Sequence, residues 1–135
     1  LFDLPEVAET GGRALADELG EHRITTHRGN FFADPIPRGY DMVSLVRILH
    51  DHDDEPALAL LTAIRAALAP GARLLIAEPM ARVPGAEAMG EAFFGLYLWA
   101  MGSGRPRSAK EIIAMLTRAG FASARAVGVA QPVNT

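Results

Sequence analysis

Residues 50–55 hold the densest group of chemically active side chains, in the order His50-Asp51-His52-Asp53-Asp54-Glu55. They follow an apolar run at 42–49, which is typical of a strand buried on both faces of a parallel sheet. An imidazole titrates near neutral pH, so His50 is a candidate general base, and a structural histidine is the alternative. The acids at 53–55 precede a helix, whose N-terminal dipole and free amides favour carboxylates. The pattern predicts a site histidine, catalytic or structural, followed by capping acids.

The same residues have a second interpretation as metal ligands. The spacing of His50, His52 and Asp54 resembles the opening of the metallo-β-lactamase-type hydrolase motif, which makes a metal-dependent hydrolase the alternative function. That motif continues with a histidine where this chain has Glu55, and it needs another histidine downstream. None follows His52. We therefore expect no metal site.

Two further carboxylates stand at the ends of predicted strands. Glu78 closes the apolar run at 73–79, and the carboxyl ends of parallel strands meet at one edge of a sheet, so Glu78 should face His50. There it could orient the imidazole and stabilise the imidazolium, while a helix cap or a partner of Arg82 is the alternative. Asp3 stands where nucleotide-binding α/β folds keep an acid for ribose hydroxyls, and a solvated strand end or helix cap is its alternative.

The elements that must position these residues alternate along the chain. Strands are expected at the start of the chain and at 23–28, 42–49, 73–79 and 121–129. Helices are expected as two short pieces within 6–19, broken by two glycines, and at 56–68, 86–101 and 108–120, the last opened by a Ser108–Glu111 capping box. This alternation predicts an α/β fold with a largely parallel, doubly wound sheet and helices on both faces.

The helix at 86–101 is apolar nearly all round, which is typical either of deep core or of a pocket wall. Its place after the strand that carries Glu78 favours the pocket. The ribose acid of such folds follows a glycine-rich turn by about 20 residues, which puts that turn before residue 1. The internal candidate at 102–104 follows a helix and lacks a third glycine. We therefore expect the first strand and its glycine loop to be absent.

Composition narrows the classes of function. The 135 residues suit one domain, and 50% hydrophobic with 21% charged residues supplies a core. A net charge of −3 with scattered basic residues argues against a nucleic-acid partner. No cysteine is present, which excludes disulfides and thiolate catalysis and fits a reducing compartment. No apolar run approaches the length of a membrane span and no signal region opens the chain, so we expect a cytoplasmic domain.

Five stretches, in this order, resemble the SAM-dependent O-methyltransferases (SAM, S-adenosylmethionine) that include plant caffeate-type, acetylserotonin and bacterial carotenoid enzymes. The stretches are 2–5, 29–32, 45–51, 74–79 and 104–108. The resemblance implies a Rossmann-like class I methyltransferase domain over residues 1–135 with SAM as cofactor and no metal. It also implies that the N-terminal dimerisation domain, the first strand with its glycine loop and the last strand are missing, and that the full-length protein is a homodimer.

The resemblance also implies roles for individual residues. Asp3 would bind the SAM ribose, Asn30, Phe31 and Phe32 the adenine, and Arg47 the cofactor; His50 would deprotonate the acceptor hydroxyl, Asp51 would lie on the substrate side, and Glu78 would orient His50. Three positions depart from the family pattern. Asn30 replaces an aspartate and loses a charge-assisted bond, His52 replaces a tryptophan, and Pro106 stands where plant members have a second catalytic glutamate.

Within the family, residues 45–54 and 97–108 look most like the bacterial enzymes that methylate hydroxyneurosporene and demethylspheroidene in carotenoid synthesis. An apolar substrate wall would suit a long polyene and consists of Met80, Phe93, Phe94, Tyr97, Trp99 and Met101. The partner is then a hydroxylated small molecule, and an apolar substrate could bring the protein to a membrane surface. An inactive fragment or binding module is the remaining alternative, because the loop that cradles the methionine part of SAM is absent.

Overall fold

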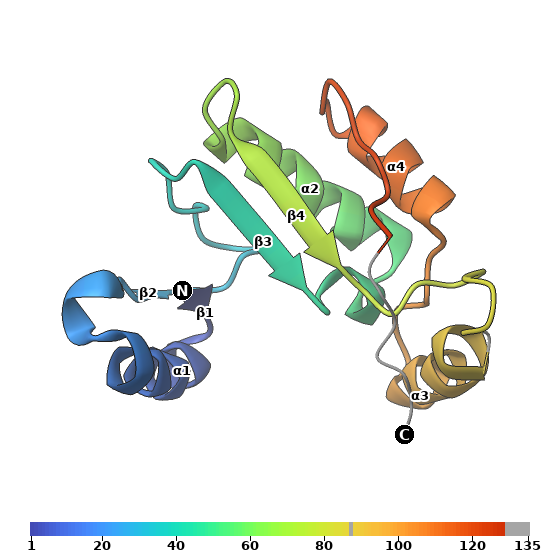
Figure 1. Cartoon of the computed structure of the whole chain (residues 1–135), viewed down its shortest axis with the longest axis horizontal. Helices are drawn as coiled ribbons and strands as arrows, with labels where there is room; N and C mark the ends of the chain where they lie inside the picture. Colours follow the sequence, from blue (N-terminus) through green and yellow to red (C-terminus); the bar gives the residue numbers. More distant parts are fainter. Residues whose placement is uncertain (87, 129–135) are drawn as a thin grey trace.

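The computed structural model describes residues 1–86 and 88–128, and its strands form two parallel pairs (Figure 1). β1 (Phe2–Asp3) pairs with β2 (His27–Arg28), and β3 (Met42–Val46) pairs with β4 (Arg73–Ala77). Within the described ranges no strand joins the two pairs. The predicted α/β class with parallel strands is confirmed.

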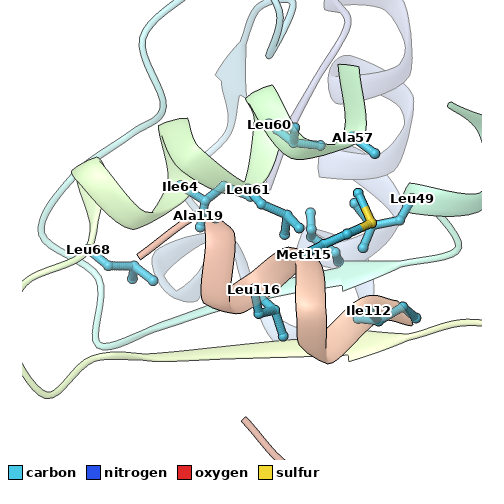
Figure 2. Packing of buried hydrophobic residues seen from close by; sticks show 11 residues of the cluster. Leu49, Ala57, Leu60, Leu61, Ile64, Leu68, Ile112, Met115, Leu116 and Ala119 are labelled. Carbon is cyan, nitrogen blue, oxygen red and sulfur yellow. The ribbon is translucent and has the colours of Figure 1, made fainter. Parts of the chain in front are cut away.

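The core lies on one face of the β3–β4 pair, under α2 (Asp54–Ala67) and α4 (Ala109–Arg118). Figure 2 shows apolar side chains of the two helices meeting each other and Leu49. Both helices match their predicted positions. The α4 capping box is present, since the Ser108 backbone N–H donates to Glu111 Oε2 at 2.9 Å and the Ser108 hydroxyl accepts from the Glu111 backbone N–H.

The prediction that these strands are buried on both faces is wrong in the part of the chain that the structure describes. Val43 and Leu45 pack on the core, whereas Met42, Val46 and Leu75 are exposed on the opposite face. The physical reason is that the described helices cover only one face of the β3–β4 pair. A continuous apolar run in the sequence is therefore not enough to show that a strand is buried on both faces.

The predicted break at Gly11 and Gly12 is also wrong, because α1 (Pro5–Leu19) is one helix. Gly12 is buried, and a Cβ there would lie 2.5 Å from Oγ1 of Thr26, the residue before β2. Glycine therefore permits close packing at this site, and this outweighs its helix-propensity cost of about 1 kcal/mol. The strand expected at 23–28 shortens to β2, since Glu21–Arg23 forms a 3₁₀ turn (η1).

Three other boundaries differ from the predictions. The strand expected at 42–49 ends at Val46, and Leu49–Asp51 forms a 3₁₀ turn (η2). The helix expected at 86–101 consists of a π-helical segment, Ala88–Phe93 (η3), followed by α3 (Phe94–Met101). Residues 121–128 form no strand, because no neighbouring strand among the described residues offers them backbone partners; residue 129 lies outside the described residues.

None of the described helices combines the length and apolar character needed to cross a membrane.

Candidate active site

A sharp turn after β3 carries His50. Arg47 has a positive φ of 56°, unusual for a residue with a side chain, while its backbone N–H still donates to Ala77 O at 2.9 Å. The next two backbone N–H groups, of Ile48 and Leu49, donate to Glu78 Oε1 at 3.0 and 2.8 Å. Left-handed backbone at such a residue costs roughly 1–3 kcal/mol and persists only where the surroundings fix it. Glu78 is one group that fixes this turn.

The second oxygen of Glu78 meets the imidazole ring. His50 Nδ1 lies 2.7 Å from Glu78 Oε2, and both side chains are 3% exposed. The contact is at ion-pair distance without the alignment of a hydrogen bond, and neither atom has another partner among the described residues. The ends of β3 and β4 thus bring the two residues together, as the argument from parallel strands expects. A carboxylate at Nδ1 leaves Nε2 as the nitrogen for proton transfer.

Asp51 and Phe94 cover the other side of the ring. His50 Nε2 lies 3.1 Å from Asp51 Oδ1, and the Phe94 ring centre is 5.4 Å from that of the imidazole. Phe93 and Tyr97 meet Phe94 edge-on, with ring centres 5.4 and 6.3 Å away. One predicted wall residue, Phe94, therefore lies beside His50, and two others pack on Phe94.

The other three predicted wall residues are placed differently. Met80 is partly buried and packs against the hydrophobic core. Trp99 is 79% exposed and Met101 is also exposed. The structure does not bring Trp99 or Met101 into the ring cluster beside His50. Arg47, predicted to contact the cofactor, has its guanidinium carbon 5.5 Å from the Phe94 ring centre, which is cation–π distance.

Apart from Arg47, which follows β3, the predicted cofactor residues lie at or just after the ends of β1 and β2. Asp3 Oδ1 accepts from the Leu4 backbone N–H at 2.8 Å, and the Asp3 carbonyl accepts from the Gly29 N–H at 2.9 Å. The side-chain oxygen of Asn30 accepts from the Phe32 N–H at 2.9 Å, and the Asn30 backbone N–H donates to Asp34 Oδ2 at 2.7 Å. Asn30 therefore shapes its own turn, and sequence reasoning missed Asp34 as the acid beside it.

Three aromatic rings join this turn to the turn that carries His50. Phe31 and Phe32 have ring centres 4.7 Å apart, and His52 lies edge-on to both at 5.7 and 4.9 Å. Burial lowers the pKa of His52, and the positive charge of Arg107 adds to this effect, whereas Asp51 and Asp53 oppose it. A neutral imidazole suits a ring that packs against two phenyl rings.

With this geometry in place, comparisons with known proteins identify the family. The family described as an O-methyltransferase domain matches residues 1–122. This chain belongs to that family.

Among curated relatives, demethylspheroidene O-methyltransferase of Cereibacter sphaeroides is 43% identical over 121 residues, which are 90% of this chain and 32% of that protein. The crystal structure of LaPhzM matches with a TM-score of 0.81 at 30% identity, over 93% of this chain and 37% of the other. Human N-acetylserotonin methyltransferase in complex with SAM matches with a TM-score of 0.74 at 30% identity, over 89% and 34%. The chain spans about a third of the length of these three proteins.

The alternative of a metal-dependent hydrolase is not supported. The Asp54 carboxylate binds Arg105 at 3.1 Å and Arg107 at 2.8 Å, and the His52 ring faces the two phenylalanines. Residues 1–86 and 88–128 contain no group of three His, Cys, Asp or Glu side chains that could hold a metal ion. The arginine pair lowers the pKa of Asp54 by hydrogen bonding.

The acids at 53–55 give α2 no side-chain cap, although Asp54 and Glu55 stand in its first turn, where carboxylates favour the helix dipole. Asp53 occupies the N-cap position without a side-chain cap, and its Oδ1 instead accepts from the Gly104 N–H at 3.0 Å. In this O-methyltransferase chain Asp53 and Asp54 instead connect the turn of His50 to the loop at 102–108. Sequence reasoning missed the buried Arg107 in that loop. Its place before the Ser108 capping box was the one local signal, and that signal predicts a helix start and says nothing of burial.

Proposed function

We propose that the protein is a SAM-dependent O-methyltransferase that methylates a hydroxyl group of an apolar small molecule, with His50 as general base. The observation that carries the proposal is the buried contact between His50 Nδ1 and Glu78 Oε2 at 2.7 Å. It sits at the carboxyl ends of parallel strands, where α/β folds bind their ligands. Membership of the O-methyltransferase family supports the reaction class.

The cofactor residues fit the nucleoside half of SAM. Asp3 offers a carboxylate at the end of β1, which suits the two ribose hydroxyls. Phe31 and Phe32 offer aromatic rings, which suit a purine, and His52 closes this group as a third ring. Bound SAM would supply a methyl group on a positively charged sulfur.

His50 would take the proton of the acceptor hydroxyl at Nε2 as the oxygen forms its bond to the methyl carbon and the carbon–sulfur bond breaks. The new charge on the imidazolium is then stabilised at Nδ1 by Glu78. A positioned base of this kind contributes roughly 10²–10⁴ to the rate. Because the His50 side chain is 3% exposed, the acceptor must first displace Asp51, whose side chain is 40% exposed.

We propose a hydroxylated carotenoid of the demethylspheroidene type as acceptor. The relative that bears that substrate in its name is 43% identical over 90% of this chain. The exposed apolar side chains of Phe93 and Leu96 and the exposed ring of Tyr97 on η3 and α3 support a long apolar acceptor. Homodimer formation stays a prediction from the resemblance, and a cytoplasmic location stays a prediction from the sequence composition.

The test is methyl transfer by the longest natural protein that contains residues 1–135, called here the full protein. It is supplied with SAM carrying a labelled methyl group, and with either a demethylspheroidene-type alcohol or N-acetylserotonin. We expect label in the carotenoid at a kcat/KM at least about tenfold above that for N-acetylserotonin. Label in neither acceptor, with tight binding of S-adenosylhomocysteine by calorimetry, would favour a binding module. Higher turnover of N-acetylserotonin would reject the carotenoid while keeping the reaction class.

A further inference from the structure

The loop between α3 and α4 lies against the turn that carries His50. Arg107 Nη1 donates to the carbonyl of Leu49 and Nη2 to that of His52, both at 2.7 Å, so the carbonyls before and after His50–Asp51 share one guanidinium. The hydroxyl of Ser103 donates to the carbonyl of Asp51 at 3.2 Å. Three backbone carbonyls of this turn are therefore held by one loop.

At Gly104 the loop approaches the backbone of the turn so closely that no side chain fits between them. Gly104 has a φ of 81°, and a Cβ at this position would collide with the His50 carbonyl oxygen and lie 2.6 Å from the Asp51 carbonyl carbon. Only glycine meets both demands, because it lacks a Cβ and tolerates positive φ. The backbone of the loop thus touches the backbone of the candidate base itself.

Arg107 is the buried member of this contact, with a side chain that is 1% exposed. Its Nε and Nη2 also donate to Asp54 Oδ1 at 2.9 and 2.8 Å, so all three nitrogens are engaged. The planar guanidinium fork reaches two carbonyls and a carboxylate in fixed directions, which a lysine ammonium on a flexible stem cannot reproduce. Arg105 is the natural comparison, because it binds the same Asp54 from a far more exposed position.

We infer that Arg107 is a positioning residue for the base His50. Glu78 holds the N–H groups of Ile48 and Leu49, and Arg107 holds the carbonyls of Leu49 and His52. Together they fix both sides of a turn that begins with the left-handed backbone of Arg47. The direction of His50 Nε2 therefore depends on Arg107, which acts through the backbone of the turn and not through the imidazole ring. The inference rests on the proposed function, since it assumes that His50 acts as the base.

The experiment compares Arg107→Lys with two neighbours in the full protein. In Arg107→Lys we expect kcat to fall at least about tenfold with KM for SAM within about twofold, because a displacement near 1 Å at a reacting group can cost up to 10²-fold. Arg105→Ala should keep kcat within about twofold. Asp54→Asn removes the ion pair and keeps the carbonyl contacts, so it should lose less than about threefold. Equal losses in Asp54→Asn and Arg107→Lys would overturn the inference in favour of a simple charge role.

A stability control separates positioning from folding. Leu116→Ala removes a core side chain of α4 outside this contact, and its kcat is compared with that of Arg107→Lys at temperatures equally far below each Tm. If both variants lose the same activity under these conditions, Arg107 is merely structural and the inference fails.

A readout that needs no turnover separates this inference from the proposed function. The ¹⁵N and ¹H shifts of the His50 ring, assigned through His50→Gln, report its tautomer and its order. We expect these signals to shift or broaden in Arg107→Lys and to stay unchanged in Arg105→Ala. Unchanged His50 signals in Arg107→Lys would overturn the inference. A wild-type protein that moves no methyl group would overturn the proposed function and leave the ring signals to decide the positioning.

Discussion

Glu78 contacts both the ring of His50 and the backbone of the two residues before it. One carboxylate oxygen lies 2.7 Å from His50 Nδ1, and the other accepts from the N–H groups of Ile48 and Leu49 just before the histidine. The carboxylate therefore couples the direction of the imidazole to the conformation of the turn that carries it.

His50→Ala should lower kcat of the full protein by roughly 10²–10⁴, the usual contribution of a general base. The affinity for SAM should stay within about threefold, because Asp3, Phe31 and Phe32, which are proposed to hold the nucleoside half of SAM, lie on other turns. The measurement is steady-state methyl transfer together with calorimetry. His22→Ala, which removes an exposed histidine, serves as the control. A loss below about threefold in kcat would show that His50 is not the base.

Glu78→Gln should lower kcat while leaving the fold intact, since an amide oxygen can still accept from one or both N–H groups of the turn. Glu78→Ala should also lower the free energy of unfolding, by about 1–3 kcal/mol, because the N–H groups of Ile48 and Leu49 lose their acceptor. Chemical denaturation measures the second effect. Glu55→Gln, at an exposed acid, is the matched control. Equal stability of the two Glu78 variants would contradict the double role.

Stability should fall as the pH drops below about 6.5, in part because of His52. Its pKa in the folded protein is lowered from 6.5, chiefly by burial, while the unfolded chain keeps the ordinary value. Between these two pKa values the unfolded state binds more protons, so stability rises with pH through that window and levels off above it. The measurements are an NMR titration of the ring and Tm between pH 5 and 7.5. His52→Gln should flatten this part of the curve, and an unchanged slope would exclude His52 as its source.

Asp3→Ala should weaken SAM binding about 10- to 100-fold, because a hydrogen bond to a charged group contributes about 1.5–3 kcal/mol. Asn30→Asp should strengthen binding, since a carboxylate at Asn30 can still accept from the Phe32 N–H and adds charge beside the adenine. Calorimetric titration of the full protein measures both. Asp17→Ala removes an exposed acid of α1 and should change nothing. Unchanged affinity in both site variants would reject this cofactor edge.

Local patterns predicted the helices α2 and α4 from their periodic apolar stripes and the strand β4 from its continuous apolar run, each with clear end signals. They failed at Gly12, where the sequence shows a helix breaker and only the neighbouring Thr26 explains why glycine is needed. They also failed on the outer face of β3, since an apolar side chain does not reveal whether anything covers it.

The chain pattern was enough to predict the α/β class, the family resemblance and the pairing of His50 with Glu78, because strand ends and parallel order follow from it. Three features emerged only from the folded chain: Arg107 donates to the carbonyls of Leu49 and His52, Asp53 and Asp54 bind the loop at 102–108, and Trp99 is exposed to solvent. The physical reason is distance along the chain. A contact between residues more than 50 positions apart leaves no periodicity, cap or turn signal in either segment, so it exists only once the packing has brought them together.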